Sequence, residues 1–152
     1  MHDAISIRRL VVQYGARRVV DGLDLTIAPG CVYALLGGNG AGKTTTINAL
    51  LGFVRPSSGQ ILIGGSALAM LLDEPTSGLD PAAANDFAVQ IRAAAGRGIA
   101  VLMATHDLFN ARQVADRIGI MKHGRLVAEV AAARIGHPEL EALYLQHARV
   151  AA

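Results

Sequence analysis

The segment GGNGAGKT at residues 37–44 limits the fold of this chain more than any other part of the sequence. It matches the pattern G-x-x-x-x-G-K-[ST], whose structural setting is a strand before the glycines and a helix after them. The apolar run at 31–36 predicts a strand that is buried on both faces. A helix is expected from about residue 43 to residue 51, with Gly52 ending it. The segment therefore indicates an α/β protein with buried parallel strands.

The residue types in this segment suit the binding of a phosphate group. Glycines let successive backbone N–H groups turn toward one anion without Cβ clashes, and the positive end of the following helix points to the same place. Lys43 supplies a mobile positive charge for β- and γ-phosphates, and the hydroxyl of Thr44 is a ligand for Mg²⁺. The predicted nucleotide-binding residues are Gly37, Gly38, Asn39, Gly40, Ala41, Gly42, Lys43, Thr44 and Thr45.

An acidic pair follows a second apolar run. Residues 67–72 predict another buried strand, and Asp73 and Glu74 come directly after it. That position is the carboxyl end of a strand, where open α/β sheets bind ligands. Asp73 is expected to hold Mg²⁺ through water, and Glu74 is expected to polarise the water that attacks the γ-phosphate. The simpler alternative is that both carboxylates lie on a surface loop and cap a helix.

Two further side chains are candidates because of their positions. His106 follows a third predicted buried strand at 99–105 and precedes an aspartate, although a structural histidine is the alternative. Tyr14 ends the first predicted strand, at 4–14, where it would either fill the core or an edge, or stack on a nucleotide base. Four other histidines are expected to be solvated: His2, His123, His137 and His147.

The remaining segments complete an α/β pattern. Strands are expected at 19–27 and 60–63, and a hairpin at 118–130 that turns at His123 and Gly124. Helices are expected in three places: after the cap Asp80, with Pro81 in the first turn and Gly96 beyond the end; after the cap Asp107, with Phe109, Val114 and Ile118; and at 137–150.

The composition excludes several classes of protein. The net charge is +2 and the basic residues are scattered, so no nucleic-acid-binding patch is expected. The single cysteine, Cys31, precludes an internal disulfide and fits a reducing compartment as an inert core thiol. No apolar run approaches 18 residues, and the first residues lack the apolar run of a signal peptide. We therefore expect a cytoplasmic chain that could dock on a membrane protein.

Together these motifs resemble the ATP-binding subunit of ATP-binding cassette (ABC) transporters. GGNGAGKTT resembles the Walker A loop, with Gly38 where the family often has proline, and LAMLLDEP resembles Walker B followed by the catalytic glutamate, Glu74. ATHD places His106 as the switch histidine, and Tyr14 stands where the A-loop aromatic stacks on adenine. The combination DEPTSGLDP is highly specific to the family, and its D-loop corresponds to Ser77, Gly78, Leu79 and Asp80.

The resemblance extends over nearly the whole chain, and it implies a fold and a set of partners. RIGIMKHGRLVAE matches the strand pair after the switch helix, and the stretch from GKTTT to ILIGG resembles ABC-2 type exporters. The implied fold is an α/β sheet of the P-loop NTPase (RecA-like) type flanked by helices, with a small antiparallel β part. The implied cofactors are ATP and Mg²⁺. The implied partners are a second nucleotide-binding subunit, identical or different, and a transmembrane permease, and the implied location is the inner face of the membrane.

One block of the family pattern is absent from the chain. In the family, the strand resembling QILIGG precedes a Q-loop strand, a helical subdomain and the signature LSGGQ, and only then Walker B. Here little more than residues 64–67 joins the two strands, and none of the glutamines fits the Q-loop. The resemblance therefore implies a single, internally truncated nucleotide-binding domain over residues 1–152, with an apparent deletion near 64–67. The lost strand is expected to leave an exposed sheet edge.

Three functions remain open at this point. The first is an ABC-type ATPase subunit that binds Mg-ATP, with turnover expected to be slow or absent because the signature and the Q-loop are missing. The second is a non-catalytic module, or a degenerate remnant, that uses the cassette fold to pair with a complete subunit or a membrane partner. The third is a compact P-loop enzyme of another family.

Overall fold

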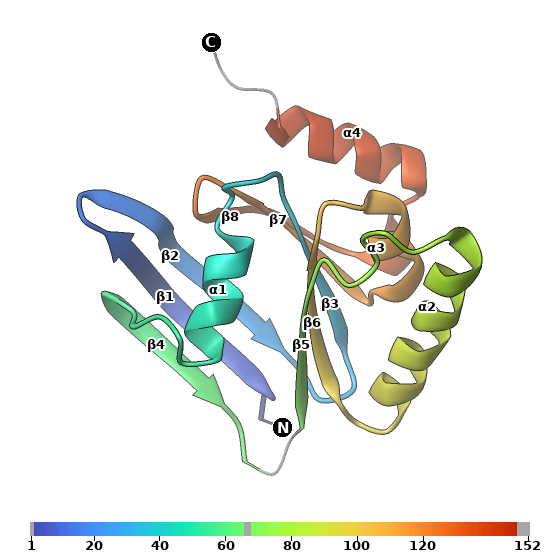
Figure 1. The fold of residues 1–152 in the computed structure, drawn as a ribbon, viewed down its shortest axis with the longest axis horizontal. Coiled ribbons are helices and arrows are strands. Elements are labelled where there is room, and N and C mark those ends of the chain that lie inside the picture. Colours follow the sequence, from blue (N-terminus) through green and yellow to red (C-terminus); the bar gives the residue numbers. More distant parts are fainter. Residues whose placement is uncertain (1, 66–67, 149–152) are drawn as a thin grey trace.

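The computed structural model describes residues 2–65 and 68–148, which form two sheets and four α-helices (Figure 1). The smaller sheet is antiparallel, with the order β2-β1-β4, and contains β1 (Ile5–Tyr14), β2 (Arg17–Ile27) and β4 (Ser58–Ile63). The predicted strands at 4–14 and 19–27 are confirmed, and the short third strand begins at Ser58 rather than at residue 60.

The larger sheet has the order β5-β6-β3-β7-β8. Its strands are β3 (Val32–Leu36), β5 (Ala69–Asp73), β6 (Ala100–Thr105), β7 (Arg117–Lys122) and β8 (Arg125–Ala131). The first four in the sheet are parallel, and β8 is antiparallel to β7. The predicted hairpin is confirmed, and both of its turn residues, His123 and Gly124, have positive φ angles.

Four helices cover the larger sheet: α1 (Lys43–Leu50), α2 (Pro81–Gly96), α3 (Leu108–Val114) and α4 (His137–Ala148). Helix α1 lies between the two sheets, whereas α2, α3 and α4 lie on the opposite side of the larger sheet (Figure 1). A short 3₁₀ turn, Ala132–Arg134, follows β8. None of the described helices is long and apolar enough to cross a bilayer.

Strand β3 shows why the apolar runs predicted fully buried strands. Tyr33 and Leu35 point into the core shared with α1 and the antiparallel sheet, whereas Val32, Ala34 and Leu36 point into the core shared with α2, α3 and α4. Both faces of a central parallel strand are therefore covered, and a continuous apolar run follows. The predicted mixed α/β sheet with flanking helices is confirmed.

The structure has a strand where residues 67–72 predicted one, but the prediction that this strand is buried is wrong. Residues 66 and 67 lie outside the described part of the chain, and β5 begins at Ala69 with an exposed residue and is only half-buried along most of its length. Among the described strands β5 pairs with β6 alone, so its outer edge has no neighbour. The apolar run indicates a strand but not its position at the edge.

The prediction for the segment after Asp107 is correct at the start and wrong at the end. Asp107 caps α3 by accepting a hydrogen bond from the Asn110 backbone, as expected. The helix stops at Val114 because Ala115 is extended and the carboxylate of Asp116 accepts the N–H of Val32 at 2.8 Å. That contact directs the chain into the sheet, so Ile118 is a buried residue of β7 rather than part of the helix.

The other two predicted helices need small corrections. Asp80 caps α2 as expected, but Gly96 is the last helical residue, and Gly98, with φ +91°, is the glycine beyond the end. The last helix begins at His137 and is described up to Ala148, so the predicted end at 149–150 lies outside the described residues. His137 is half-buried and its ring forms a T-shaped pair with that of Phe109, so the expectation that it is solvated is wrong.

Candidate functional site

The glycine loop lies at the carboxyl end of β3, and its backbone leaves no room for side chains at two positions. A Cβ at Gly37 would lie 2.6 Å from the carbonyl oxygen of Met121, and a Cβ at Gly42 would lie 2.7 Å from that of Val19. Gly42 also has φ +105°, which favours glycine. Gly38 has open space around it, so a larger residue would fit there. The loop is therefore packed against β2 and β7 rather than free.

Lys43 extends back across the loop. It is buried, with 6% of its side chain exposed. Its Nζ donates to the carbonyl oxygen of Gly37 at 2.5 Å and to Oε1 of Glu74 at 3.3 Å. A buried ammonium group needs such partners, and both are anionic or strongly polar acceptors. The lysine charge is thus held at the mouth of the loop.

The acidic pair lies directly beside this loop. Register in the parallel sheet aligns Asp73 with Ala104 of β6, and Leu36 of β3 with Thr105, so the carboxyl ends of three strands meet at one edge. The hydroxyl of Thr44 donates to Oδ2 of Asp73 at 2.8 Å. The alternative in which the acidic pair only caps a helix is not what the structure has, because the cap of α2 is Asp80.

Glu74 is the residue with the most polar contacts in this cluster. Its Oε1 lies 3.0 Å from Nδ1 of His106, and its Oε2 accepts a hydrogen bond from Thr105. Partial burial acts to raise the pKa of Glu74, but the hydrogen bonds and charges of His106 and Lys43 outweigh it, and the net pKa is lowered. Glu74 is therefore ionised at neutral pH.

These residues enclose a pocket of about 300 Å³. It is lined by Val19, residues 38–45, Asp73 and Glu74. The volume is at the lower end of the range for small-molecule sites. A lysine, a row of backbone amides and two carboxylates at its wall suit a phosphate chain that is bound together with a cation.

Thr44 and Asp73 fit a magnesium ion in particular. Both offer oxygen atoms, which Mg²⁺ prefers, and they lie within hydrogen-bonding distance of each other. Mg²⁺ is commonly held by one or two protein oxygens together with phosphates and waters. The described residues contain no cluster of three or more His, Cys, Asp or Glu side chains that would hold a metal by themselves.

The lining of this pocket lacks four of the predicted parts, namely Tyr14, Gly37, His106 and the D-loop residues 77–80. Tyr14 is at the end of β1, is 53% exposed and does not line the pocket, whereas Val19 of β2 does. Ser77, Gly78 and Leu79 are exposed on the segment before α2 and do not line it either. The structure thus brings Lys43, Thr44, Asp73, Glu74 and His106 together and leaves Tyr14 and these three residues at the surface.

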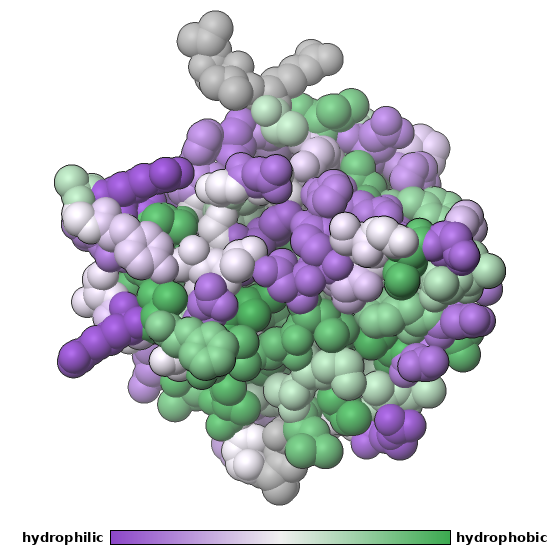
Figure 2. Space-filling view, viewed as in Figure 1, coloured by the Kyte–Doolittle hydropathy of each residue, from purple (hydrophilic) through white to green (hydrophobic). Residues whose placement is uncertain are grey.

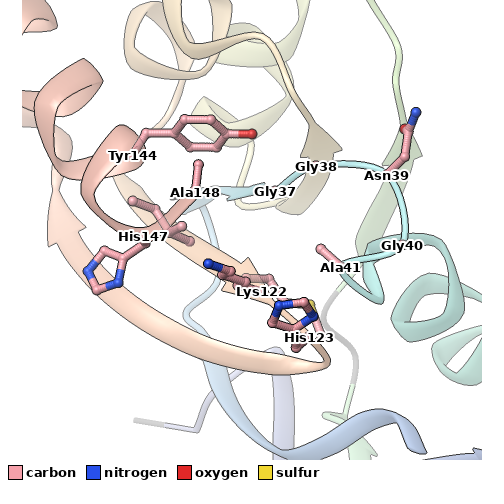
Figure 3. Close-up of a pocket in the computed structure, with 12 residues that line it drawn as sticks. Gly37, Gly38, Asn39, Gly40, Ala41, Lys122, His123, Tyr144, His147 and Ala148 are labelled. Carbon is pink, nitrogen blue, oxygen red and sulfur yellow. The ribbon is translucent and has the colours of Figure 1, made fainter. Parts of the chain in front are cut away.

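A second cavity, of about 210 Å³, lies on the other side of the glycine loop (Figure 3). Its walls are residues 37–41, the end of β7 with its turn, and α4. Lys122 and Tyr144 lie on opposite sides of this space in the close-up, and His147 also lines it. His147 is half-buried here rather than solvated as expected. Residues 37–41 belong to the glycine motif, but nothing in the sequence pattern predicted a cavity on this side of the loop.

Comparisons with known proteins agree with this geometry. Residues 20–149 match a family model described as ABC transporter. The chain is 29% identical to the daunorubicin/doxorubicin resistance ATP-binding protein DrrA of Streptomyces peucetius, in an alignment that covers 83% of this chain and 64% of that protein. It is 26% identical to the bacitracin transport ATP-binding protein BcrA of Bacillus licheniformis, with 86% and 70% covered.

The alignment with the Streptomyces protein has 213 positions, whereas this chain has 152 residues, so that relative contains a block with no counterpart here. Among solved structures, an ATP-binding subunit of an ABC transporter superimposes with a TM-score of 0.85 at 18% identity, over 96% of this chain and 100% of the other. The ADP form of the cassette MJ1267 gives 0.81 at 15% identity, over 95% and 96%. The third reading, a compact P-loop enzyme of another family, is excluded, and the chain belongs to the ATP-binding domains of the ABC transporter family.

Proposed function

We propose that this chain binds Mg-ATP in the pocket between the glycine loop and the acidic pair, as the ATP-binding subunit of an ABC transporter. The observation that supports the proposal most strongly is the pair of contacts that joins the two motifs, Lys43 to Glu74 and Thr44 to Asp73. In each contact a carboxylate is paired with a group that can bind part of the nucleotide complex: the ammonium of Lys43 suits a phosphate, and the hydroxyl of Thr44 suits the cation. An incoming Mg-nucleotide supplies both a phosphate for the lysine and a cation for the carboxylates.

The expected binding mode follows from the groups at the loop. The backbone amides of residues 38–42 face the phosphates, and Lys43 exchanges Glu74 for the β- and γ-phosphates. Thr44 and Asp73 separate to hold the magnesium ion, Asp73 through water. Bound Mg²⁺ neutralises charge on the terminal phosphates. We propose that the adenine stacks on Tyr14, whose exposed ring is available for contact with a base.

Glu74 and His106 are the proposed catalytic residues. Because the pKa of Glu74 is lowered, its carboxylate is ionised and can accept a hydrogen bond from a water near the γ-phosphate. Nδ1 of His106 lies 3.0 Å from Oε1 of this carboxylate, and the His106 side chain is 63% exposed, so it can turn toward the phosphate. Ser77, Gly78, Leu79 and Asp80 form the proposed D-loop.

We further propose that the isolated chain turns over ATP slowly or not at all. Residues 64–68 join β4 to β5, which belong to different sheets, and 66–67 lie outside the described residues. No helical segment lies between these strands in the described part, and the sequence has no LSGGQ signature. The proposed partners are a second nucleotide-binding subunit and an exporter permease, which would place the chain at the inner face of the membrane.

Calorimetric titration with a non-hydrolysable ATP analogue and Mg²⁺ tests the binding proposal. Lys43→Ala is expected to weaken the affinity at least about tenfold, or about 1.4 kcal/mol, because a charge-assisted contact with the phosphates is lost. Lys122→Ala is the matched control, since it removes the same charge from outside the pocket. Equal affinities for wild type and Lys43→Ala would show that the glycine loop has been assigned wrongly.

A second candidate function is favoured by the surface around β5. Figure 2 shows hydrophobic surface gathered over the region of β4, the end of α1 and β5. Phe53, Leu68 and Leu62 are 78%, 68% and 51% exposed. Such a surface fits a non-catalytic module that pairs with another protein. A steady-state ATPase assay distinguishes the two functions, because robust hydrolysis that is lost in Glu74→Gln would rule out the module.

A further inference from the structure

A fully buried hydroxyl group lies directly behind Glu74. Thr105 is the last residue of β6 and has no exposed surface. Its Oγ1 donates to Oε2 of Glu74 at 3.3 Å and accepts the backbone N–H of Asp107 at 3.0 Å. Thr105 lies within the ATHD stretch that identified His106, but the motif assigned no role to the threonine itself.

These two contacts fix the direction of the hydroxyl. A threonine hydroxyl has one proton and two lone pairs. Because Asp107 donates to it, the proton points away from Asp107 and toward Glu74. Rotating the hydroxyl would leave a buried donor or a buried N–H without a partner, which is unfavourable. The Oε2 atom of Glu74 is therefore held from behind, while Oε1 faces Lys43 and His106.

A second link attaches the turn after Glu74 to the start of α3. The side-chain amide of Asn110 donates to Oγ1 of Thr76 at 3.3 Å and to Oδ2 of Asp107 at 2.5 Å. Glu74 itself has φ +48°, a conformation that non-glycine residues rarely adopt unless their surroundings enforce it. Its backbone N–H bonds to the carbonyl of Ala104 at 2.8 Å. The carboxylate is thus fixed through both its backbone and its side chain.

We propose that Thr105 is a positioning residue that keeps the carboxylate of Glu74 turned toward Lys43, and hence toward the γ-phosphate end of the pocket, with Asn110 supporting the same arrangement. This inference rests on the proposed function, because it assumes that the phosphates bind beside Lys43. It predicts that the Thr105 hydroxyl affects the binding of a triphosphate through Glu74, whereas a purely structural role would affect diphosphate and triphosphate alike.

The experiment measures the ratio of the affinities for a non-hydrolysable ATP analogue and for ADP, both with Mg²⁺. Glu74→Gln removes a negative charge next to the γ-phosphate and is expected to raise this ratio about five- to tenfold. Thr105→Val keeps the shape of the side chain but lacks the hydroxyl. It frees the carboxylate to turn away and is expected to raise the ratio about two- to fivefold. Thr105→Ser keeps the hydroxyl and is expected to stay within about twofold of wild type.

The double variant tests whether Thr105 acts through Glu74. In the Glu74→Gln background, Thr105→Val is expected to leave the ratio within about twofold. Three results would overturn the inference: an unchanged ratio in Thr105→Val, an equal loss of both affinities in that variant, or the same increase in the ratio in both the wild-type and the Glu74→Gln backgrounds. Asn110→Ala, expected to raise the ratio in the same direction, replaces Thr105→Val if that variant does not fold. If the proposed function itself is wrong, the result is different, because Lys43→Ala then changes neither affinity.

Discussion

Gly42 combines a left-handed backbone with a close neighbour, and this makes Gly42→Ala a sharp test of the loop. At φ +105° a residue with a Cβ is strained by about 1–3 kcal/mol. The new methyl group would also lie 2.7 Å from the carbonyl oxygen of Val19 and 2.9 Å from Cε of Met121. The methionine can move, but the carbonyl is part of the β2 backbone. Overpacking of this kind typically costs about 1–3 kcal/mol more.

We therefore expect Gly42→Ala to lower the free energy of unfolding by about 2–6 kcal/mol, out of the roughly 5–15 kcal/mol typical of a folded domain. Denaturant unfolding monitored by circular dichroism measures this change. Gly38→Ala is the matched control, because Gly38 has no atom within 4 Å of an added Cβ and no left-handed φ. Its free energy of unfolding should change by less than about 1 kcal/mol. Similar losses for both variants would refute the account of how the loop is packed.

Three further predictions concern stability and metal dependence. Because the pKa of Glu74 is lowered in the folded state, its ionised form stabilises the fold at pH values above the ordinary pKa of 4.5. In denaturant unfolding, wild type should therefore be more stable than Glu74→Gln, and this difference should shrink as the pH falls below 4.5. A difference that does not change with pH would contradict the contacts of Glu74 with Lys43 and His106. Asp80→Ala should lower the unfolding free energy by about 1 kcal/mol, because the Ala83 N–H loses its cap, and thermal unfolding that matches wild type would argue against that cap. Adding Mg²⁺ should raise the affinity for the ATP analogue about tenfold less in Asp73→Asn than in wild type, whereas binding without the metal should be less affected. Titrations with and without Mg²⁺ measure this gain, and an unchanged gain would contradict the role of Asp73.

The parts of the fold that could be predicted depend on local chemistry. The glycine loop and its flanking elements follow from backbone requirements that only glycine meets. The start of α2 follows from Asp80 and Pro81, which cap and begin a helix whatever surrounds them. Strands β3 and β6 could be identified because both faces of a central parallel strand are buried, which requires continuous apolar residues.

The parts that could not be predicted depend on contacts between distant segments. The end of α3 is decided by Asp116 and Val32, which are far apart in the sequence. An exposed sheet edge is expected from the missing block and is found at β5 among the described strands, but the apolar residues of β5 do not themselves predict its partial exposure. Thr105 reads as one more buried strand residue until the structure places its hydroxyl behind Glu74. The second cavity beside the glycine loop arises where α4 approaches β7, and nothing in the sequence of either element predicts that approach.

A crystal structure with Mg²⁺ and a non-hydrolysable ATP analogue tests the central claim most directly. The γ-phosphate is expected beside Nζ of Lys43, with the magnesium ion bound by Oγ1 of Thr44 and with Asp73 in its water shell. The carboxylate of Glu74 is expected to face the γ-phosphate. A phosphate chain located elsewhere, for example in the cavity beside Tyr144, or a magnesium ion remote from Thr44 and Asp73, would contradict the claim.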